Sequence, residues 1–133
     1  MELDNVSDVI RAGLAYERSR VEIASYNLAM ANVALPPGVA SPLQSANIPS
    51  LFAQHLGLTV SESQAATERG QEVRLAHEPG HPFADAEGMV RYPKLDAARE
   101  MATLVSATRA YESNIRAYNS LRAMTLKAFE IGK

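Results

Sequence analysis

The chain of 133 residues contains no cysteine and no tryptophan, and aromatic residues make up only 6% of it. The lack of cysteine excludes disulfide bonds and zinc sites built from thiolates. Lysine and arginine number 13 against 15 aspartate and glutamate residues, which gives a net charge of −2. Proteins that hold nucleic acid by its phosphates carry a basic excess, and this chain has none. The sequence therefore predicts no nucleic-acid partner.

Long apolar runs are also missing. No stretch approaches the roughly 18–20 apolar residues that cross a bilayer, so we expect a soluble chain with no direct membrane span. Residues 1–5, MELDN, are acidic where a secretory signal peptide is basic. We therefore expect no cleaved signal peptide.

Alanine, by contrast, occurs 22 times. Small helix formers favour helices, but without bulky side chains they fill a globular core poorly. A chain of this length is able to form a compact core. The composition nevertheless predicts that much of the apolar burial lies between molecules.

The first zone, residues 1–35, has the periodicity of one long helix. Its apolar residues recur at steps of three, four and seven, as in a heptad repeat, and Glu17 interrupts the series. Proline lacks an N–H and restricts the residue before it, so Pro36 and Pro37 are expected to end the helix. The interface candidates from this stripe are Leu14, Val21 and Leu28.

The third zone, residues 95–133, carries a second long helix whose start Asp96 is expected to cap. At 1.5 Å per residue, the two helices would be about 50 and 55 Å long. The middle zone is too small to cover both, which favours packing against helices of other chains. The interface candidates from the second helix are Met101, Tyr111, Ile115, Tyr118 and Leu121.

The middle zone, residues 36–94, holds all seven prolines and five of the seven glycines. Residues 36–56 have the composition of a linker, and residues 57–94 that of short strands and turns. Strands are expected over 56–61 and 72–76. The predicted fold class is mainly α, with two long terminal helices forming a coiled-coil-like hairpin around a small β-containing middle segment.

One segment matches a catalytic pattern. Residues 77–81 read HEPGH, which fits the H-E-x-x-H motif of zinc proteases. That chemistry needs both histidines on one face of a helix, whereas Pro79 and Gly80 favour a turn. We therefore expect a tight turn whose histidines hydrogen-bond or face solvent. The sequence predicts no enzyme, no metal, no cofactor and no small-molecule substrate.

Several segments carry a family resemblance. Residues 25–32, SYNLAMAN, resemble the S-x-N-[IL]-A-N-A-N signature of bacterial flagellar axial proteins, with Met30 in place of asparagine. EPGHP at 78–82, RYP at 91–93, ATRAYESN at 107–114 and LKAFEIG at 126–132 are similar to a narrower group, the proximal-rod C subunits of the flagellar basal body. Residues 36–56 lack the Tyr- and Arg-rich strand of that group.

The resemblance implies a structural subunit of a helically assembled, periplasm-spanning rod that transmits motor torque. It implies that the partners are other rod subunits, copies of the chain and the flagellar type III export apparatus. Asn27 and Asn32 would then contribute hydrogen bonds near the end of the first helix, while the apolar stripes pack within and between subunits. The alternative that the residues leave open is a soluble helical adaptor or homo-oligomeric binding module.

Overall fold

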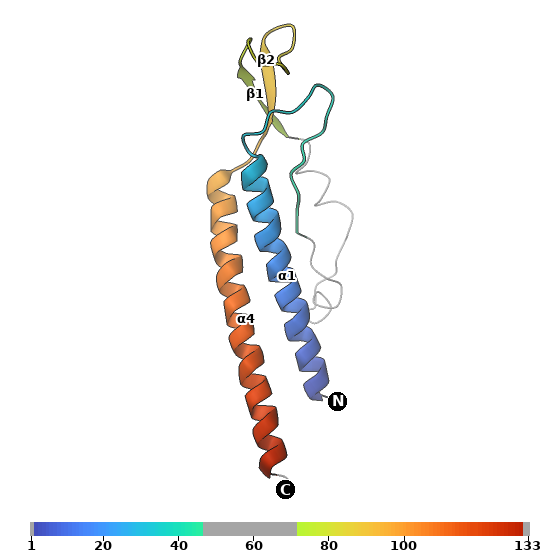
Figure 1. Cartoon of the computed structure of the whole chain (residues 1–133), viewed down its shortest axis with the longest axis vertical. Helices are drawn as coiled ribbons and strands as arrows, with labels where there is room; N and C mark the ends of the chain where they lie inside the picture. Colours follow the sequence, from blue (N-terminus) through green and yellow to red (C-terminus); the bar gives the residue numbers. More distant parts are fainter. Residues whose placement is uncertain (1, 47–71, 132–133) are drawn as a thin grey trace.

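The computed structural model describes residues 2–46 and 72–131. Its elements are α1 (Glu2–Met30), β1 (Val73–His77), β2 (Met89–Pro93) and α4 (Ala97–Ile131). Figure 1 shows the two helices as a long antiparallel pair, with the strands at the end where α1 finishes and α4 begins. The predicted mainly helical hairpin with a small β-containing middle is confirmed. The strand expected over 56–61 lies outside the described residues.

α1 ends at Met30, five residues before the limit expected from the prolines. Leu35 is buried and forms an antiparallel bridge with Arg91 of β2, in which its N–H donates to the Arg91 carbonyl at 2.8 Å. The chain must leave the helix before residue 35 to make this pairing. A tertiary contact, and not Pro36, therefore ends α1.

α4 begins where the sequence predicted. The Arg99 N–H donates to Asp96 Oδ1 at 3.1 Å, which confirms Asp96 as the cap. α4 has 35 residues against 29 in α1, a difference of about 9 Å at 1.5 Å per residue. Its C-terminal end projects past the start of α1 (Figure 1), and there Phe129 is 72% exposed.

β1 and β2 pair in antiparallel register from Val73 opposite Pro93 to His77 opposite Met89. β1 lies one residue beyond the expected 72–76, and β2 was not singled out in the sequence. Val90 is fully buried, and Tyr92, two residues further on the same face, is also buried. The two strands and their connection thus form a small unit with its own buried apolar residues. We call residues 73–93 the head.

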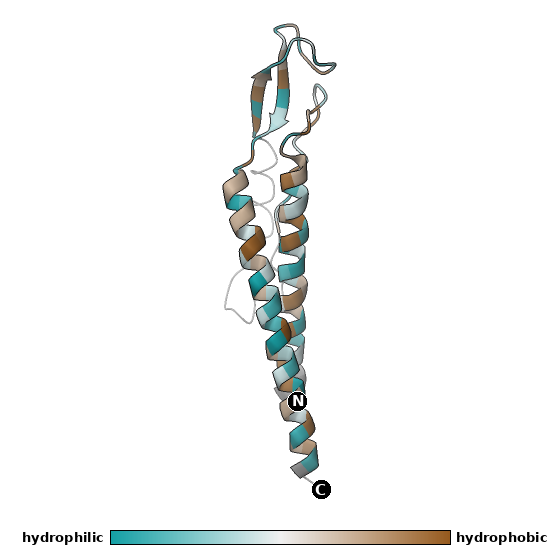
Figure 2. Ribbon diagram, turned by 60° about the vertical axis from the view of Figure 1, so that its left-hand side comes forward, coloured by the Kyte–Doolittle hydropathy of each residue, from teal (hydrophilic) through white to brown (hydrophobic). Residues whose placement is uncertain are grey.

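The seam between the helices is formed by small and polar residues. Ala24 is 1% exposed and Ala107 is fully buried, so the two backbones approach closely. Arg20 forms a 2.8 Å ion pair with Glu17 at the edge of the seam and also donates to Ser106 of α4 at 3.4 Å. In Figure 2, hydrophobic and hydrophilic residues alternate along both helices. Among the described side chains of α1 and α4, no large apolar one is buried, so the larger apolar side chains lie away from the centre of the seam.

Candidate assembly surface

One flank of the helix pair carries a shallow groove. Val21 and Glu22 of α1 line it together with Thr108 and Tyr111 of α4. Val21 and Tyr111 are half-buried, so the groove presents apolar surface that the chain itself covers only in part. We call this surface the open groove.

The other stripe members continue the open groove by helical repeat. Leu14 and Leu28 lie seven residues before and after Val21, and residues seven apart share one face of a helix. Both are half-buried. Ile115, four residues after Tyr111 on α4, is 38% exposed. These side chains flank the seam instead of filling it, and their role at an interface stays a prediction.

A second depression lies near the projecting end of α4. Tyr118, Leu121 and Leu126 of α4 line it together with Ser7 of α1. Leu126 is mostly exposed. Apolar side chains are thus exposed at the end of the helix pair, and Phe129 is exposed on the part of α4 that projects past α1 (Figure 1).

Met101 lies elsewhere. It is 57% exposed and, with Val105 and Arg109, lines a separate shallow depression on α4. The stripe expected from Met101 to Tyr118 is therefore divided between two surfaces. At 3.6 residues per turn, Tyr111 lies about 80° around α4 from Met101, so the two side chains point to different sides of the helix.

Asn27 and Asn32 make different contacts. Asn27 is 2% exposed, and its side-chain amide binds the backbone of Gln44: Nδ2 donates to the Gln44 carbonyl at 2.9 Å, and Oδ1 accepts from the Gln44 N–H at 2.8 Å. Asn32 is exposed, and its Oδ1 accepts from Arg74 Nη2 at 3.2 Å. Asn27 thus links α1, and Asn32 the turn that follows α1, to later parts of the chain.

A polar network lies within the two strands and the turn between them, and Arg74 connects it to Asn32 just after α1. Arg74 stacks over the ring of Tyr92 at 4.5 Å, and the Tyr92 hydroxyl donates to Glu78 Oε2 at 3.0 Å. Burial raises the pKa of the Tyr92 phenol, and the neighbouring Glu78 carboxylate raises it further, because both oppose a phenolate. Tyr92 therefore remains a neutral hydrogen-bond donor at physiological pH.

The H-E-x-x-H segment forms the expected turn. His77 ends β1, and the His81 N–H donates to the Glu78 carbonyl at 3.0 Å. His81 Nδ1 accepts from the Phe83 N–H at 3.1 Å. The helical placement of both histidines that a zinc protease needs is absent here. Within residues 2–46 and 72–131, no group of three or more His, Cys, Asp or Glu residues is placed to hold a metal ion.

None of the helices in the described part of the chain combines the length and apolar content needed to cross a membrane. The fold and its surfaces instead define an elongated helical hairpin protein with apolar flanks.

No family model matches the chain. It is 31% identical to the flagellar basal-body rod protein FlgC of Salmonella typhimurium over 135 residues, covering 100% of both chains. It is 30% identical to FlgC of Escherichia coli O6:H1 over 143 residues, again covering both completely.

A third relative, FlgC of Bacillus subtilis, is 46% identical over 67 residues, which cover 50% of this chain and 45% of that one. The chain belongs to the FlgC family of flagellar basal-body rod proteins. It is a structural subunit of the flagellar rod, located in the basal body, as the sequence resemblance predicted. The relatives give no support to the soluble adaptor.

Sequence reasoning missed two features of the surface. The pairing of Asn27 with Gln44 had a partial signal, since Asn27 belongs to the family signature, but nothing marked Gln44 as its partner. The contact of Arg74 with Tyr92 required the register of the two strands, and β2 had not been recognised. Polar residues in strands become informative only once their cross-strand partners are known.

Proposed function

We propose that the open groove and the projecting end of α4 receive terminal helices of neighbouring rod subunits, including copies of this chain. The observation that carries the proposal is the position of the larger apolar side chains. Leu14, Val21 and Ile115 lie beside a seam already filled by small residues, and all three remain partly exposed. Covering them needs helices that the described chain does not supply.

The mechanical role follows from many such contacts. Apolar contacts are non-directional and individually small, but a staggered helical array makes each subunit contact several neighbours at once. Twisting the array disturbs all of these contacts together. The rod therefore resists torsion and transmits torque from the motor across the periplasm, which makes the subunit necessary for motility.

The remaining partners belong to the same proposal. The chain leaves the cytoplasm through the flagellar type III export apparatus and needs no cleaved signal peptide. Its near-balanced charge and the lack of a metal cluster among the described residues favour neither nucleic acid nor a bound substrate. The protein acts as a structural subunit and not as an enzyme.

Ile115→Asp tests the proposal in cells. A carboxylate cannot be buried against an apolar partner without a large desolvation penalty, so rods should fail to assemble and motility should be lost. Ser113→Asp is the matched control, because Ser113 is exposed and lies about 200° around α4 from Ile115. Both variants should be synthesised to equal levels. Normal swimming by the Ile115→Asp strain would overturn the proposed interface.

A further inference from the structure

After α1 the chain turns and runs back beside it. Leu35 pairs with β2, the Val39 N–H donates to the Pro36 carbonyl at 3.2 Å, and Gly38 adopts a φ of +79° in the turn. Residues 39–46 then run back alongside α1 (Figure 1). We call residues 39–46 the strap.

The side chain of Asn27 holds the strap only through main-chain atoms of Gln44. The carboxamide supplies one donor and one acceptor, so with the Gln44 N–H and carbonyl it reproduces one pair of a β-ladder. The Gln44 side chain is exposed and takes no part in this pairing. Asn27 is almost fully buried, so losing the strap would leave its amide without these partners.

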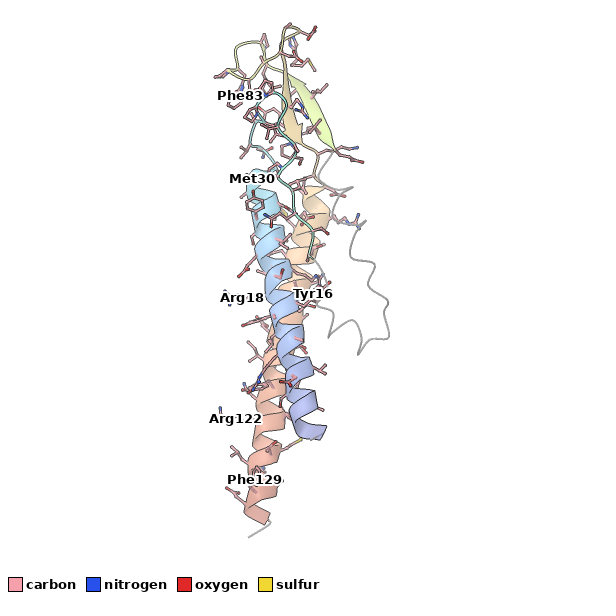
Figure 3. All side chains as sticks on the ribbon, turned by 90° about the vertical axis from the view of Figure 1, so that its right-hand side faces the viewer. Tyr16, Arg18, Met30, Phe83, Arg122 and Phe129 are labelled. Carbon is pink, nitrogen blue, oxygen red and sulfur yellow. The ribbon has the colours of Figure 1, made fainter. Side chains whose placement is uncertain are left out.

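The strap lies on the flank opposite the open groove. Gln44 and Ala46 line a groove together with Tyr16 and Ile23 of α1 and Thr103 of α4. Ile23 follows Val21 of the open groove by two residues, which is about 200° around the helix. Figure 3 shows Tyr16 and Arg18 on different sides of α1, and Arg18 lines the open groove. Each flank of α1 therefore has its own groove.

The two grooves differ in occupation. On the Ile23 flank the chain's own strap is already in place: hydrogen bonds of 2.9 and 2.8 Å join Gln44 to Asn27, and the Val39 carbonyl accepts from Arg91 Nη1 at 3.3 Å. On the Val21 flank, no described segment outside α1 and α4 lines the groove. A helix approaching the first flank meets the strap, whereas a helix approaching the second meets partly exposed apolar side chains.

We propose that the strap blocks one flank of α1 and so makes the helix pair one-sided. Asn27 is the positioning residue: it holds residues 39–46 over one flank, so that a helix of a second copy or another rod subunit enters only through the open groove. This inference rests on the proposed assembly through the open groove, and it adds that neighbouring helices approach α1 from one side only. A subunit that accepted helices on both flanks would form competing stacks, and blocking one flank selects a single arrangement.

The absence of cysteine allows a direct test with one introduced thiol. Thr103→Cys places a thiol in the strap-side groove, and its rate of maleimide labelling is measured on the unassembled subunit. Gln44→Pro removes the N–H that donates a hydrogen bond to Asn27 Oδ1, and it leaves the sequence of α1 unchanged. Gln44→Ala is the matched control, because it keeps both backbone groups. We expect Gln44→Pro and Asn27→Leu to raise labelling about tenfold, and Gln44→Ala to leave it unchanged.

The same thiol is then labelled in assembled rods. With the native strap, labelling of Thr103→Cys should be equal in subunit and rod, because the strap and not a neighbour covers the site. A clear fall on assembly would show a partner helix on this flank and overturn the proposal. Unchanged labelling after Gln44→Pro would also overturn it. Failure of the assembly surface itself appears separately, as normal motility in the Ile115→Asp strain.

Discussion

Arg74 and Tyr92 face each other directly across the two-stranded sheet, with the guanidinium 4.5 Å from the ring centroid. The same guanidinium donates to Asn32, just beyond the end of α1. One side chain thus packs on the partner strand and also connects the head to the segment just after α1. The head keeps a defined position on the helices because of contacts of this kind, together with the bridge between Leu35 and Arg91.

Arg74→Ala should lower the free energy of unfolding by about 1 kcal/mol, the sum of a partly exposed cation–π contact and a surface hydrogen bond. Chemical denaturation followed by circular dichroism measures the change. Leu75→Thr is the control, since Leu75 is mostly exposed and threonine suits a strand. Equal stability of Arg74→Ala and the parent chain would show that the contacts of Arg74 with Tyr92 and Asn32 contribute nothing to stability.

Tyr92 gives the head a defined pH dependence. Its pKa in the folded chain is raised above the ordinary value of 10.0, so folding favours the protonated phenol. The stability that Tyr92 contributes is therefore complete below pH 10 and is lost as pH rises through the raised pKa. The difference in stability between the parent chain and Tyr92→Phe should be constant up to about pH 9 and shrink above pH 10. A difference that grew with rising pH would contradict this assignment.

Gly88 occupies a position that only glycine fits well. Its φ is +75°, and a Cβ would lie 3.0 Å from Pro79 Cβ and 3.3 Å from His77 Nε2. Gly88→Ala should cost about 1–2 kcal/mol of stability from backbone strain and crowding together. Gly80→Ala, in the same connection, meets no atom within 4 Å and should be nearly neutral. Thermal melts of the two variants separate these outcomes.

The seam between α1 and α4 should not accommodate a larger side chain at Ala107. Ala107 is fully buried between the helices, so Ala107→Leu forces them apart and should destabilise the chain by about 1–3 kcal/mol. Ala117→Leu adds the same atoms at an exposed site of α4 and serves as control. Denaturation midpoints of the two variants provide the comparison. Comparable midpoints would mean that the helices are not closely packed at Ala107.

Periodicity predicted the two helices well, because a 3.6-residue repeat and the Asp96 cap are local properties. It did not predict what fills the seam. Leu14, Val21 and Leu28 carry the clearest hydrophobic signal in α1, but the buried residues of this helix include Ala24 and Asn27, which carry little. Small residues are needed where two helix backbones lie close together. A sequence reveals such positions only when the partner helix is known.

The end of α1 and the strap were unpredictable for a related reason. Pro36 is a strong local stop, yet Leu35 had already left the helix to pair with Arg91, 56 residues later. The composition of residues 36–56 indicated a linker, whereas Gln44 is held by a buried amide. That contact depends on main-chain atoms, which leave no trace in residue type.

The most direct measurement is the labelling of a single thiol in the open groove. Thr108 is exposed and lines this groove beside Val21 and Tyr111. Maleimide labelling of Thr108→Cys is compared between purified subunits and rods isolated from motile cells. We predict a fall in the labelling rate of about tenfold or more on assembly, because a neighbouring helix covers the groove. Equal labelling in subunits and rods would contradict it.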